Sequence, residues 1–230
     1  TFVLKNILMS YNWNTRTELL LGAERMEYLS HCHVLVVGLG GVGAYAAEQI
    51  CRAGIGHMTI VDADTVNESN INRQLPALHS TLGMQKAEVV GRRLLDINPR
   101  LKLTILNEFL RDERTDEVLS SQKYDFIVDA IDSLSPKVYL LAYAYKHDIP
   151  IVSSMGAGAK LDPSQVKIAD ISKSYNCTLA RAVRKRLHHL GVNKGIPVVF
   201  STEFADPDAI VEVENEQCKR TTTGTVAYMP

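Results

Sequence analysis

The residues best suited to chemistry are four glycines, Gly38, Gly40, Gly41 and Gly43, which follow a short apolar run at residues 34–37. Glycine permits a tight turn and a close approach of the backbone to a phosphate. The helix that we expect at residues 41–53 would present its free N–H groups to the same anion. A purely structural turn between strand and helix is the alternative interpretation. The whole context favours nucleotide binding.

Asp62 ends the next apolar run, at residues 58–61. An acid in this place accepts hydrogen bonds from a ribose hydroxyl in dinucleotide-binding proteins. The order of strand, glycines, helix, strand and acid therefore predicts a nucleotide site. It does not distinguish NAD from ATP, and on these residues alone an NAD-dependent oxidoreductase would be the commoner outcome.

The polar segment at residues 62–74 goes beyond what an NAD site needs. Besides Asp62 it contains Asp64, Asn70, Arg73 and Gln74, and Lys86 follows on the next expected helix. Helical side chains lean toward the helix N-terminus, so Lys86 can reach back toward the carboxyl ends of the strands. Arg73 and Lys86 together could neutralise a triphosphate as charge moves onto pyrophosphate. Each cation alone is more simply a solvated surface residue.

Asp132 is the candidate magnesium ligand. It follows the expected strand at residues 126–130, at the carboxyl end where parallel sheets bind ligands. We expect Ser135 and Pro136 to start the next helix, which leaves Asp132 free of a capping role. A hard oxygen ligand at this point suits Mg²⁺. Asp129 is the rival and ranks second, because its place within the strand predicts burial.

The elements that position these residues alternate between strand and helix patterns. This order predicts an α/β, Rossmann-like, mostly parallel sheet with helices on both faces. After residue 156 the pattern changes to an antiparallel and helical extension. The expected strands are residues 34–37, 58–61, 101–106, 126–130, 149–153, 166–171 and 198–201, and the expected helices are residues 41–53, 82–97, 136–147 and 178–190.

Charge and cysteine usage restrict the class of protein further. The 230 residues carry a formal net charge of −1 at pH 7, so any basic binding site must be local. No apolar run approaches the roughly 20 residues of a membrane-spanning helix. No two of the four cysteines are spaced C-x-x-C, which argues against a structural zinc site or a redox pair. A reducing, cytoplasmic setting fits best.

The sequence D-x-D-x-V-x-x-S-N-x-N-R-Q at residues 62–74, after a GxGGVG loop, resembles the signature of the E1-like (ThiF/MoeB-type) adenylating superfamily. The resemblance implies an ATP-dependent, adenylate-forming enzyme whose glycine loop and Asp62 hold the nucleotide. It implies that Asn70, Arg73 and Lys86 bind phosphates. It also implies that Asp132 binds Mg²⁺ and the α-phosphate.

Arg16 resembles the N-terminal arginine that dimers of this superfamily send into the partner's ATP site, which implies a homodimer and a phosphate contact of the arginine-finger kind. An exposed residue of an N-terminal helix is an equally supported interpretation.

The second half indicates which branch of the superfamily the chain resembles. Branches that activate a ubiquitin-like or sulfur-carrier protein usually carry paired C-x-x-C zinc ligands or a catalytic cysteine there, and this chain lacks the pairs. Residues 128–137, with Asp132-Ser133 in place of the usual Asp-Asn, resemble the tRNA threonylcarbamoyladenosine dehydratases, as do residues 156–163 and 199–203. The resemblance covers nearly the whole chain. It implies a C-terminal truncation at Pro230, since members continue with further helix.

The dehydratase resemblance implies ATP-dependent cyclisation of threonylcarbamoyladenosine in tRNA through an acyl-adenylate, with release of AMP and pyrophosphate. A cysteine desulfurase or sulfur-acceptor system is a further implied partner. Two alternatives stay open, an enzyme that activates the C-terminal glycine of a carrier protein and a non-catalytic or NAD-binding Rossmann protein.

A tRNA substrate requires a local basic surface, and the helix at residues 178–190 offers one. Its expected apolar stripe is Leu179, Val183, Leu187 and Leu190. Its opposite face carries the candidate tRNA-binding residues Arg181, Arg184, Lys185 and His188. A solvated helix face is an equally supported interpretation. We therefore expect one domain over residues 1–230, with a nucleotide-binding half at about 30–155 and a substrate- and tRNA-facing extension at about 156–230.

Overall fold

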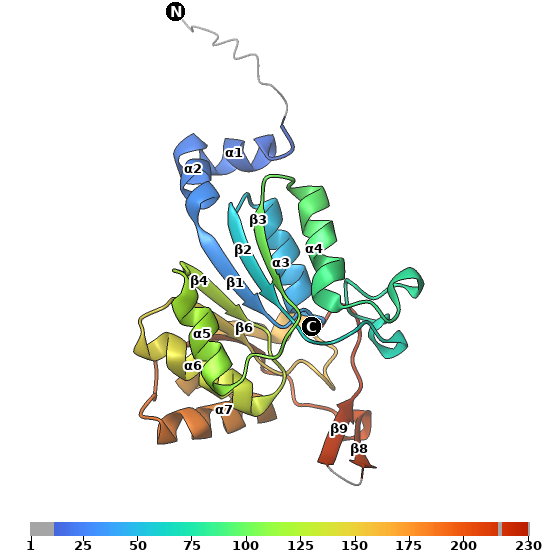
Figure 1. Cartoon of the computed structure of the whole chain (residues 1–230). Coiled ribbons are helices and arrows are strands. Elements are labelled where there is room, and N and C mark those ends of the chain that lie inside the picture. The colour runs from blue at the N-terminus through green and yellow to red at the C-terminus, as the bar shows by residue number, and fades with distance from the viewer. Residues whose placement is uncertain (1–11, 216–217, 230) are drawn as a thin grey trace, which may run out of the picture.

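A seven-stranded sheet forms the centre of the computed structural model, which describes residues 12–215 and 218–229. Its strands are β1 (His33–Val37), β2 (His57–Val61), β3 (Lys102–Leu106), β4 (Phe126–Asp129), β5 (Ile151–Ser154), β6 (Val166–Asp170) and β7 (Pro197–Ser201). They lie in the order β3-β2-β1-β4-β5-β7-β6 (Figure 1). All neighbours are parallel except β6 and β7. The predicted α/β, Rossmann-like sheet with an antiparallel addition is confirmed.

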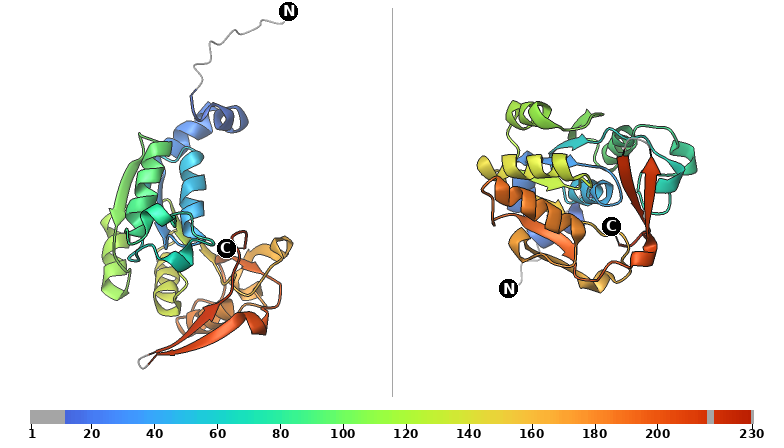
Figure 2. Two further views of the ribbon diagram at one scale, coloured as in Figure 1. Left: turned by 90° about the vertical axis from the view of Figure 1, so that its right-hand side faces the viewer. Right: turned by 90° about the horizontal axis from the view of Figure 1, so that it is seen from below.

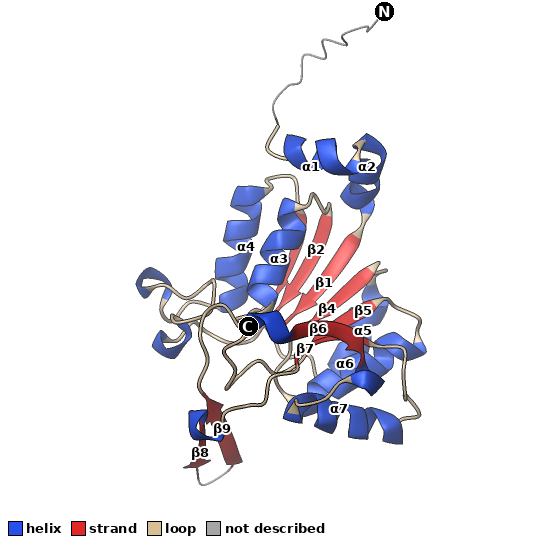
Figure 3. Ribbon diagram, turned by 180° about the vertical axis from the view of Figure 1, so that it is seen from behind, coloured by secondary structure: helices blue, strands red, loops and turns tan. Residues whose placement is uncertain are grey.

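Helices cover both faces of this sheet. The α-helices of the described chain are α1 (Thr15–Leu21), α2 (Ala23–His31), α3 (Gly43–Arg52), α4 (Lys86–Ile97), α5 (Asp112–Ser121), α6 (Leu134–Lys146) and α7 (Thr178–His189). α3 and α4 pack on one face, and α5, α6 and α7 pack on the other (Figure 3). α1 and α2 lie at the amino ends of the strands (Figure 1). Among the described helices, none has the length and apolar character needed to cross a membrane.

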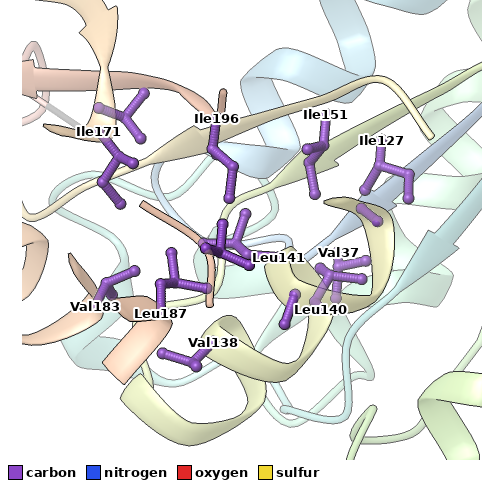
Figure 4. Packing of buried hydrophobic residues seen from close by; sticks show 14 of the residues in the cluster. Val37, Ile127, Val138, Leu140, Leu141, Ile151, Ile171, Val183, Leu187 and Ile196 are labelled. Carbon is purple, nitrogen blue, oxygen red and sulfur yellow. The ribbon is translucent and has the colours of Figure 1, made fainter. Parts of the chain in front are cut away.

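The apolar strands are buried on both faces because successive side chains point in opposite directions. On β1, Leu35 contributes to the core beneath α5, α6 and α7, whereas Val36 contributes to the core beneath α3 and α4. Both side chains are 0% exposed. In the first of these cores, residues of α6 and α7 such as Leu141 and Leu187 meet Ile151 and Ile196 (Figure 4).

Most predicted elements agree with the structure to within two residues, and α4 is the main exception. It begins at Lys86, whereas the apolar pattern predicted a start at residue 82. A 3₁₀ turn at His79–Thr81 precedes it, and Leu82 is half-exposed. The prediction that Ser135 caps the next helix is also wrong, because α6 begins at Leu134 with Ser133 as the N-cap residue.

A two-stranded hairpin follows β7 and was not predicted. It consists of β8 (Ile210–Asn215) and β9 (Cys218–Thr223), and it lies beyond the carboxyl ends of the large sheet (Figure 2). After β9 the chain returns to the sheet, where the Thr225 carbonyl accepts a hydrogen bond from Asn72 Nδ2 at 3.1 Å. The last described residues therefore lie beside the polar segment that follows β2.

Candidate active site

The glycine loop (residues 38–43) joins the carboxyl end of β1 to α3, as predicted. Gly38 has a φ of +89°, and a Cβ at this position would lie 2.7 Å from the Ala130 carbonyl oxygen. A Cβ on Gly43 would lie 1.7 Å from the Gly38 carbonyl oxygen. The nearest atom to a Cβ on Gly40, by contrast, would be Gln74 Nε2 at 3.6 Å. Gly38 and Gly43 are thus required by the packing of the loop, whereas a Cβ on Gly40 would make only an ordinary van der Waals contact with Gln74.

This difference predicts opposite outcomes for two alanine substitutions. Gly43→Ala is expected to lower the free energy of unfolding by more than about 3 kcal/mol, because its Cβ would collide with backbone. Gly40→Ala is expected to change that free energy by less than about 0.5 kcal/mol and to weaken nucleotide binding instead. Urea denaturation and nucleotide titration measure the two effects. A Gly43→Ala variant as stable as the parent would contradict the loop geometry.

Asp62 lies at the carboxyl end of β2 and holds the glycine loop. Its Oδ2 accepts a hydrogen bond from the Leu39 N–H at 2.6 Å, and its Oδ1 accepts one from the Asp64 N–H at 2.8 Å. Burial raises the pKa of the Asp62 carboxyl, although these two donors act in the opposite direction. Sequence reasoning predicted only a contact to ribose. The structural contact to Leu39 was missed, because it depends on the alignment of β1 and β2.

Lys86 is a buried cation at the first position of α4. Its side chain is 6% exposed, and Nζ donates a hydrogen bond to Asp64 Oδ2 at 2.9 Å. The Asp64 side chain is 55% exposed, so the carboxylate is on the solvent side of this ion pair. The Lys86 side chain thus reaches the polar segment that follows β2. A phosphate arriving from solvent can therefore share or replace the carboxylate partner of this ammonium group.

Asn70, Arg73 and Gln74 follow in a tight turn after Asp64. The Asn70 side chain is buried, and its Oδ1 accepts a hydrogen bond from the Asn67 N–H at 3.0 Å, which shapes the turn. Arg73 Nη1 donates to the Ser69 carbonyl at 3.0 Å and to Asn72 Oδ1 at 2.9 Å. In the described chain, the Nε and Nη2 donors of Arg73 have no protein acceptor.

Gln74 Oε1 is buried and, within the described part of the chain, has no hydrogen-bond partner. Buried acceptors are normally paired, so an orphaned one is a sign of a missing donor. It lies on the residue whose amide nitrogen approaches Gly40. The orphaned acceptor of Gln74, on a side chain that contacts the glycine loop, fits a bound ligand with hydrogen-bond donors, such as a nucleotide.

The two aspartates at the end of β4 have different surroundings. Asp129 is 0% exposed and forms an ion pair with Lys137 at 2.8 Å. This burial agrees with the expectation that Asp129 is a weaker candidate than Asp132 for the magnesium ligand. Asp132 is exposed, and the only hydrogen bond recorded for its carboxylate in the described chain comes from Ser133 Oγ at 3.2 Å. Asp132 is therefore the carboxylate of this pair that a ligand can reach.

Across the described residues, no group of three or more His, Cys, Asp or Glu side chains is arranged to hold a metal ion. Mg²⁺ commonly keeps several waters and binds through one or two carboxylates together with substrate phosphates. A single reachable carboxylate beside the glycine loop fits an ion that arrives with a nucleotide. Asp132 is the residue that would hold it.

Arg16 lies far from this site within its own chain. It is exposed on α1, at the amino ends of the strands, whereas the glycine loop is at their carboxyl ends (Figure 1). A role for Arg16 in nucleotide binding would require a second copy of the chain. That assignment stays a prediction.

The basic face of α7 is a separate surface. Together with Asn193, its four candidate residues Arg181, Arg184, Lys185 and His188 line an open groove of about 400 Å³. Arg184 is half-buried, and its Nη1 donates to the Ser174 carbonyl at 2.7 Å, so it also holds the loop that precedes α7. The predicted apolar stripe ends at Leu187, because Leu190 is 48% exposed.

A glycine loop, a facing acid and two cations at the carboxyl edge of a parallel sheet define a nucleotide-binding protein of the Rossmann-like class. The model of the ThiF family matches residues 11–229. The chain belongs to the ThiF family.

Individual relatives agree with this assignment. The tRNA threonylcarbamoyladenosine dehydratase of Bacillus subtilis is 41% identical over 208 residues, which are 89% of this chain and 82% of the relative. The enzyme of the same name from Escherichia coli is 38% identical over 208 residues, 86% of this chain and 77% of its own length. A crystal structure of the E. coli dehydratase in complex with ATP aligns with a TM-score of 0.79 at 38% identity and covers 84% of this chain and 82% of that one.

Proposed function

We propose that this chain catalyses the ATP-dependent dehydration of threonylcarbamoyladenosine in tRNA. The observation that carries the proposal is the match to dehydratases over most of both chains, in a protein whose fold brings the predicted nucleotide-binding residues of the glycine loop, β2, α4 and β4 to one edge of the sheet. The competing NAD-binding function leaves the buried Lys86 and the exposed Asp132 without a purpose.

In this proposal the chain binds ATP with its phosphates against the glycine loop and its ribose near Asp62. The N-terminus of α3 presents free N–H groups to the phosphates. The threonine carboxylate of the substrate attacks the α-phosphorus, which forms an acyl-adenylate and releases pyrophosphate. Lys86 and Arg73 stabilise the negative charge that moves onto the leaving pyrophosphate. When bound at Asp132, Mg²⁺ would neutralise further phosphate charge.

The second step needs no covalent attachment to the enzyme. The ureido group of the same nucleotide attacks the activated carbonyl, a ring closes, a proton is lost, and AMP leaves with one oxygen of the former carboxylate. Because both groups belong to one nucleotide, positioning can supply much of the acceleration. The environment of Cys177 agrees with this scheme. Its thiol is buried and accepts a hydrogen bond from the Ala180 N–H at 3.4 Å, as a cap of α7.

The test is AMP formation from ATP and Mg²⁺ with three alternative substrates. These are tRNA that carries threonylcarbamoyladenosine, the same tRNA without the modification, and a ubiquitin-like sulfur-carrier protein. We expect AMP only with the modified tRNA. AMP formation or pyrophosphate exchange that depends on the carrier protein would instead support the carrier-activating alternative.

We further propose that the basic face of α7 binds the tRNA backbone. Arg181→Ala combined with Lys185→Ala is expected to weaken tRNA binding about tenfold and to reduce the salt slope of binding by about two, because two phosphate contacts are lost. The affinity for ATP should not change. Lys123→Ala combined with Lys146→Ala is the control, since it removes the same charge from exposed residues that precede β4 and β5. Equal weakening by both pairs would contradict a specific surface.

Several expectations from the sequence stay proposals. We propose that two copies associate and that Arg16 of one copy reaches the nucleotide of the other. We propose that residues 156–230 form the tRNA-facing half of a single domain. A cysteine desulfurase or sulfur-acceptor partner and a cytoplasmic location are likewise predictions from the sequence.

A further inference from the structure

Lys137 is a fully buried cation that the nucleotide site does not use. It lies in the first part of α6 and is 0% exposed. Its Nζ is 2.8 Å from Asp129 Oδ2, on a side chain that is also 0% exposed. Ser153 Oγ donates a hydrogen bond of 2.5 Å to the same carboxylate oxygen. Removing two charged groups from water costs about as much free energy as their attraction in the core returns. A buried ion pair is therefore weak evidence for stability. The other hydrogen bonds of Asp129 and Lys137 indicate a second role for this ion pair.

The ion pair holds both polar groups of Ile131. The Ile131 N–H donates to Asp129 Oδ1 at 3.0 Å, and the Ile131 carbonyl accepts from Lys137 Nζ at 2.7 Å. The backbone at Ile131 therefore cannot rotate without breaking a charged hydrogen bond inside the core. Asp132 is the next residue, and its side chain leaves the backbone in a direction that this fixed turn determines.

The same turn also contacts the glycine loop. The Ala130 N–H donates to the Val37 carbonyl at 2.9 Å, and the Ala130 carbonyl oxygen lies where a Cβ on Gly38 would be only 2.7 Å away. The turn from Ala130 to Asp132 is thus fixed on one side by the glycine loop and on the other by the ion pair. A shift of this turn would move Asp132 relative to a nucleotide held by the loop.

We propose that Asp129, Lys137 and Ser153 are positioning residues for adenylation, which hold the turn so that the Asp132 carboxylate faces the nucleotide phosphates and the Mg²⁺ that accompanies them. This inference rests on the proposed function. None of the three residues touches the substrate. They act through the backbone of Ile131.

The test removes both charges together, because a single substitution would leave one buried charge unpaired and would unfold the protein for a trivial reason. In Asp129→Asn combined with Lys137→Met, the asparagine can still accept from the Ile131 N–H, but the Ile131 carbonyl loses its charged donor. We expect kcat for AMP formation to fall about 100-fold, as for a reacting group that is misplaced by about 1 Å. At saturating Mg²⁺ we also expect KM for ATP to stay within about twofold of the parent value. The urea midpoint of unfolding should stay close to that of the parent.

The dependence of ATP binding on Mg²⁺ is a second readout, and it needs no turnover. We measure the Mg²⁺ concentration at which ATP binding reaches half of its maximal affinity. We expect this concentration to be about tenfold higher in the double variant, because the Asp132 carboxylate is no longer held in place. Lys160→Met is the control, because Lys160 is also buried but donates to the carbonyls of Asn176 and Ser201. It should leave the Mg²⁺ requirement unchanged.

Each outcome is informative. Lost stability with unchanged kcat per folded molecule and an unchanged Mg²⁺ requirement would overturn the proposal. If the double variant does not fold, Ser153→Ala keeps both charges and should raise the Mg²⁺ requirement about threefold; an unchanged requirement would count against the network. If the parent chain forms no AMP with modified tRNA, the proposed function fails, and the Mg²⁺ dependence of ATP binding still decides whether the network positions Asp132.

Discussion

Asp132→Ala is expected to lower kcat for AMP formation by about 10²- to 10³-fold, the loss typical when a group that stabilises transition-state charge is removed. Asp132 is the reachable carboxylate after β4, in the turn whose Ala130 contacts the glycine loop. Since its side chain is exposed, the free energy of unfolding should change by less than about 0.5 kcal/mol. Single-turnover measurement of AMP at saturating ATP and modified tRNA gives the rate directly.

Two variants make this result specific to the carboxylate. Asp132→Asn keeps the shape of the side chain but removes its charge, and it should be almost as slow as Asp132→Ala. Ser133→Ala removes only the 3.2 Å hydrogen bond to Asp132 Oδ1 and should stay close to the parent rate. Parent-like activity of Asp132→Asn would rule out Asp132 as the ligand of the ion.

Lys86→Met is expected to reduce kcat/KM for ATP by about 10²- to 10³-fold, because it removes the cation that we propose stabilises the leaving pyrophosphate. The methionine can occupy the space of the buried lysine stem. The partner left behind, Asp64, has a side chain that is 55% exposed and can be hydrated, so little stability should be lost. ATP titration and steady-state kinetics measure the effect on binding and on turnover separately.

Arg92→Met is the matched control for this substitution. Arg92 lies on the same helix, α4, but is exposed and has no place in the nucleotide site. The same change of net charge there should leave kcat/KM within about twofold of the parent value. If the two variants lost activity equally, the general charge of the helix would explain the effect, and Lys86 would have no special role.

Much of the fold could be predicted because the apolar residues of this chain follow clear patterns, as continuous runs in the strands and at helical spacing in the helices. The apolar runs that became β1, β2 and β4 are buried on both faces, and glycine marks the end of β1 (Gly38) and the start of β2 (Gly56). The same patterns could not predict α5, since only Thr115, Val118 and Leu119 of its residues are buried. Nor could they show that β7 lies between β5 and β6, because strand order depends on contacts distant in sequence.

The candidate site was predictable where a residue's place on its own element decides its direction. The direction of Lys86 was predicted from the general lean of helical side chains, although its helix begins at Lys86 itself and not at residue 82. Asp132 is exposed after a buried strand. Contacts between elements were not predictable, such as Asp62 with the Leu39 N–H or Asp129 with Lys137.

One signal in the sequence did indicate the burial of Lys137. This lysine shares a helix face with Leu140 and Leu141, three and four residues later, and both leucines are 0% exposed. A cation on the apolar face of a helix needs a buried partner. The sequence alone could not identify that partner as Asp129, because the contact joins a strand end to the helix that follows.

The most direct test of the central claim uses tRNA whose threonylcarbamoyladenosine carries heavy oxygen in the threonine carboxylate. The chain is incubated with this tRNA, ATP and Mg²⁺, and both AMP and the modified nucleoside are analysed by mass spectrometry. If the carboxylate attacks the α-phosphorus, AMP will contain one heavy oxygen and the nucleoside will have lost one water. AMP without the label, or a nucleoside of unchanged mass, would contradict dehydration through an acyl-adenylate.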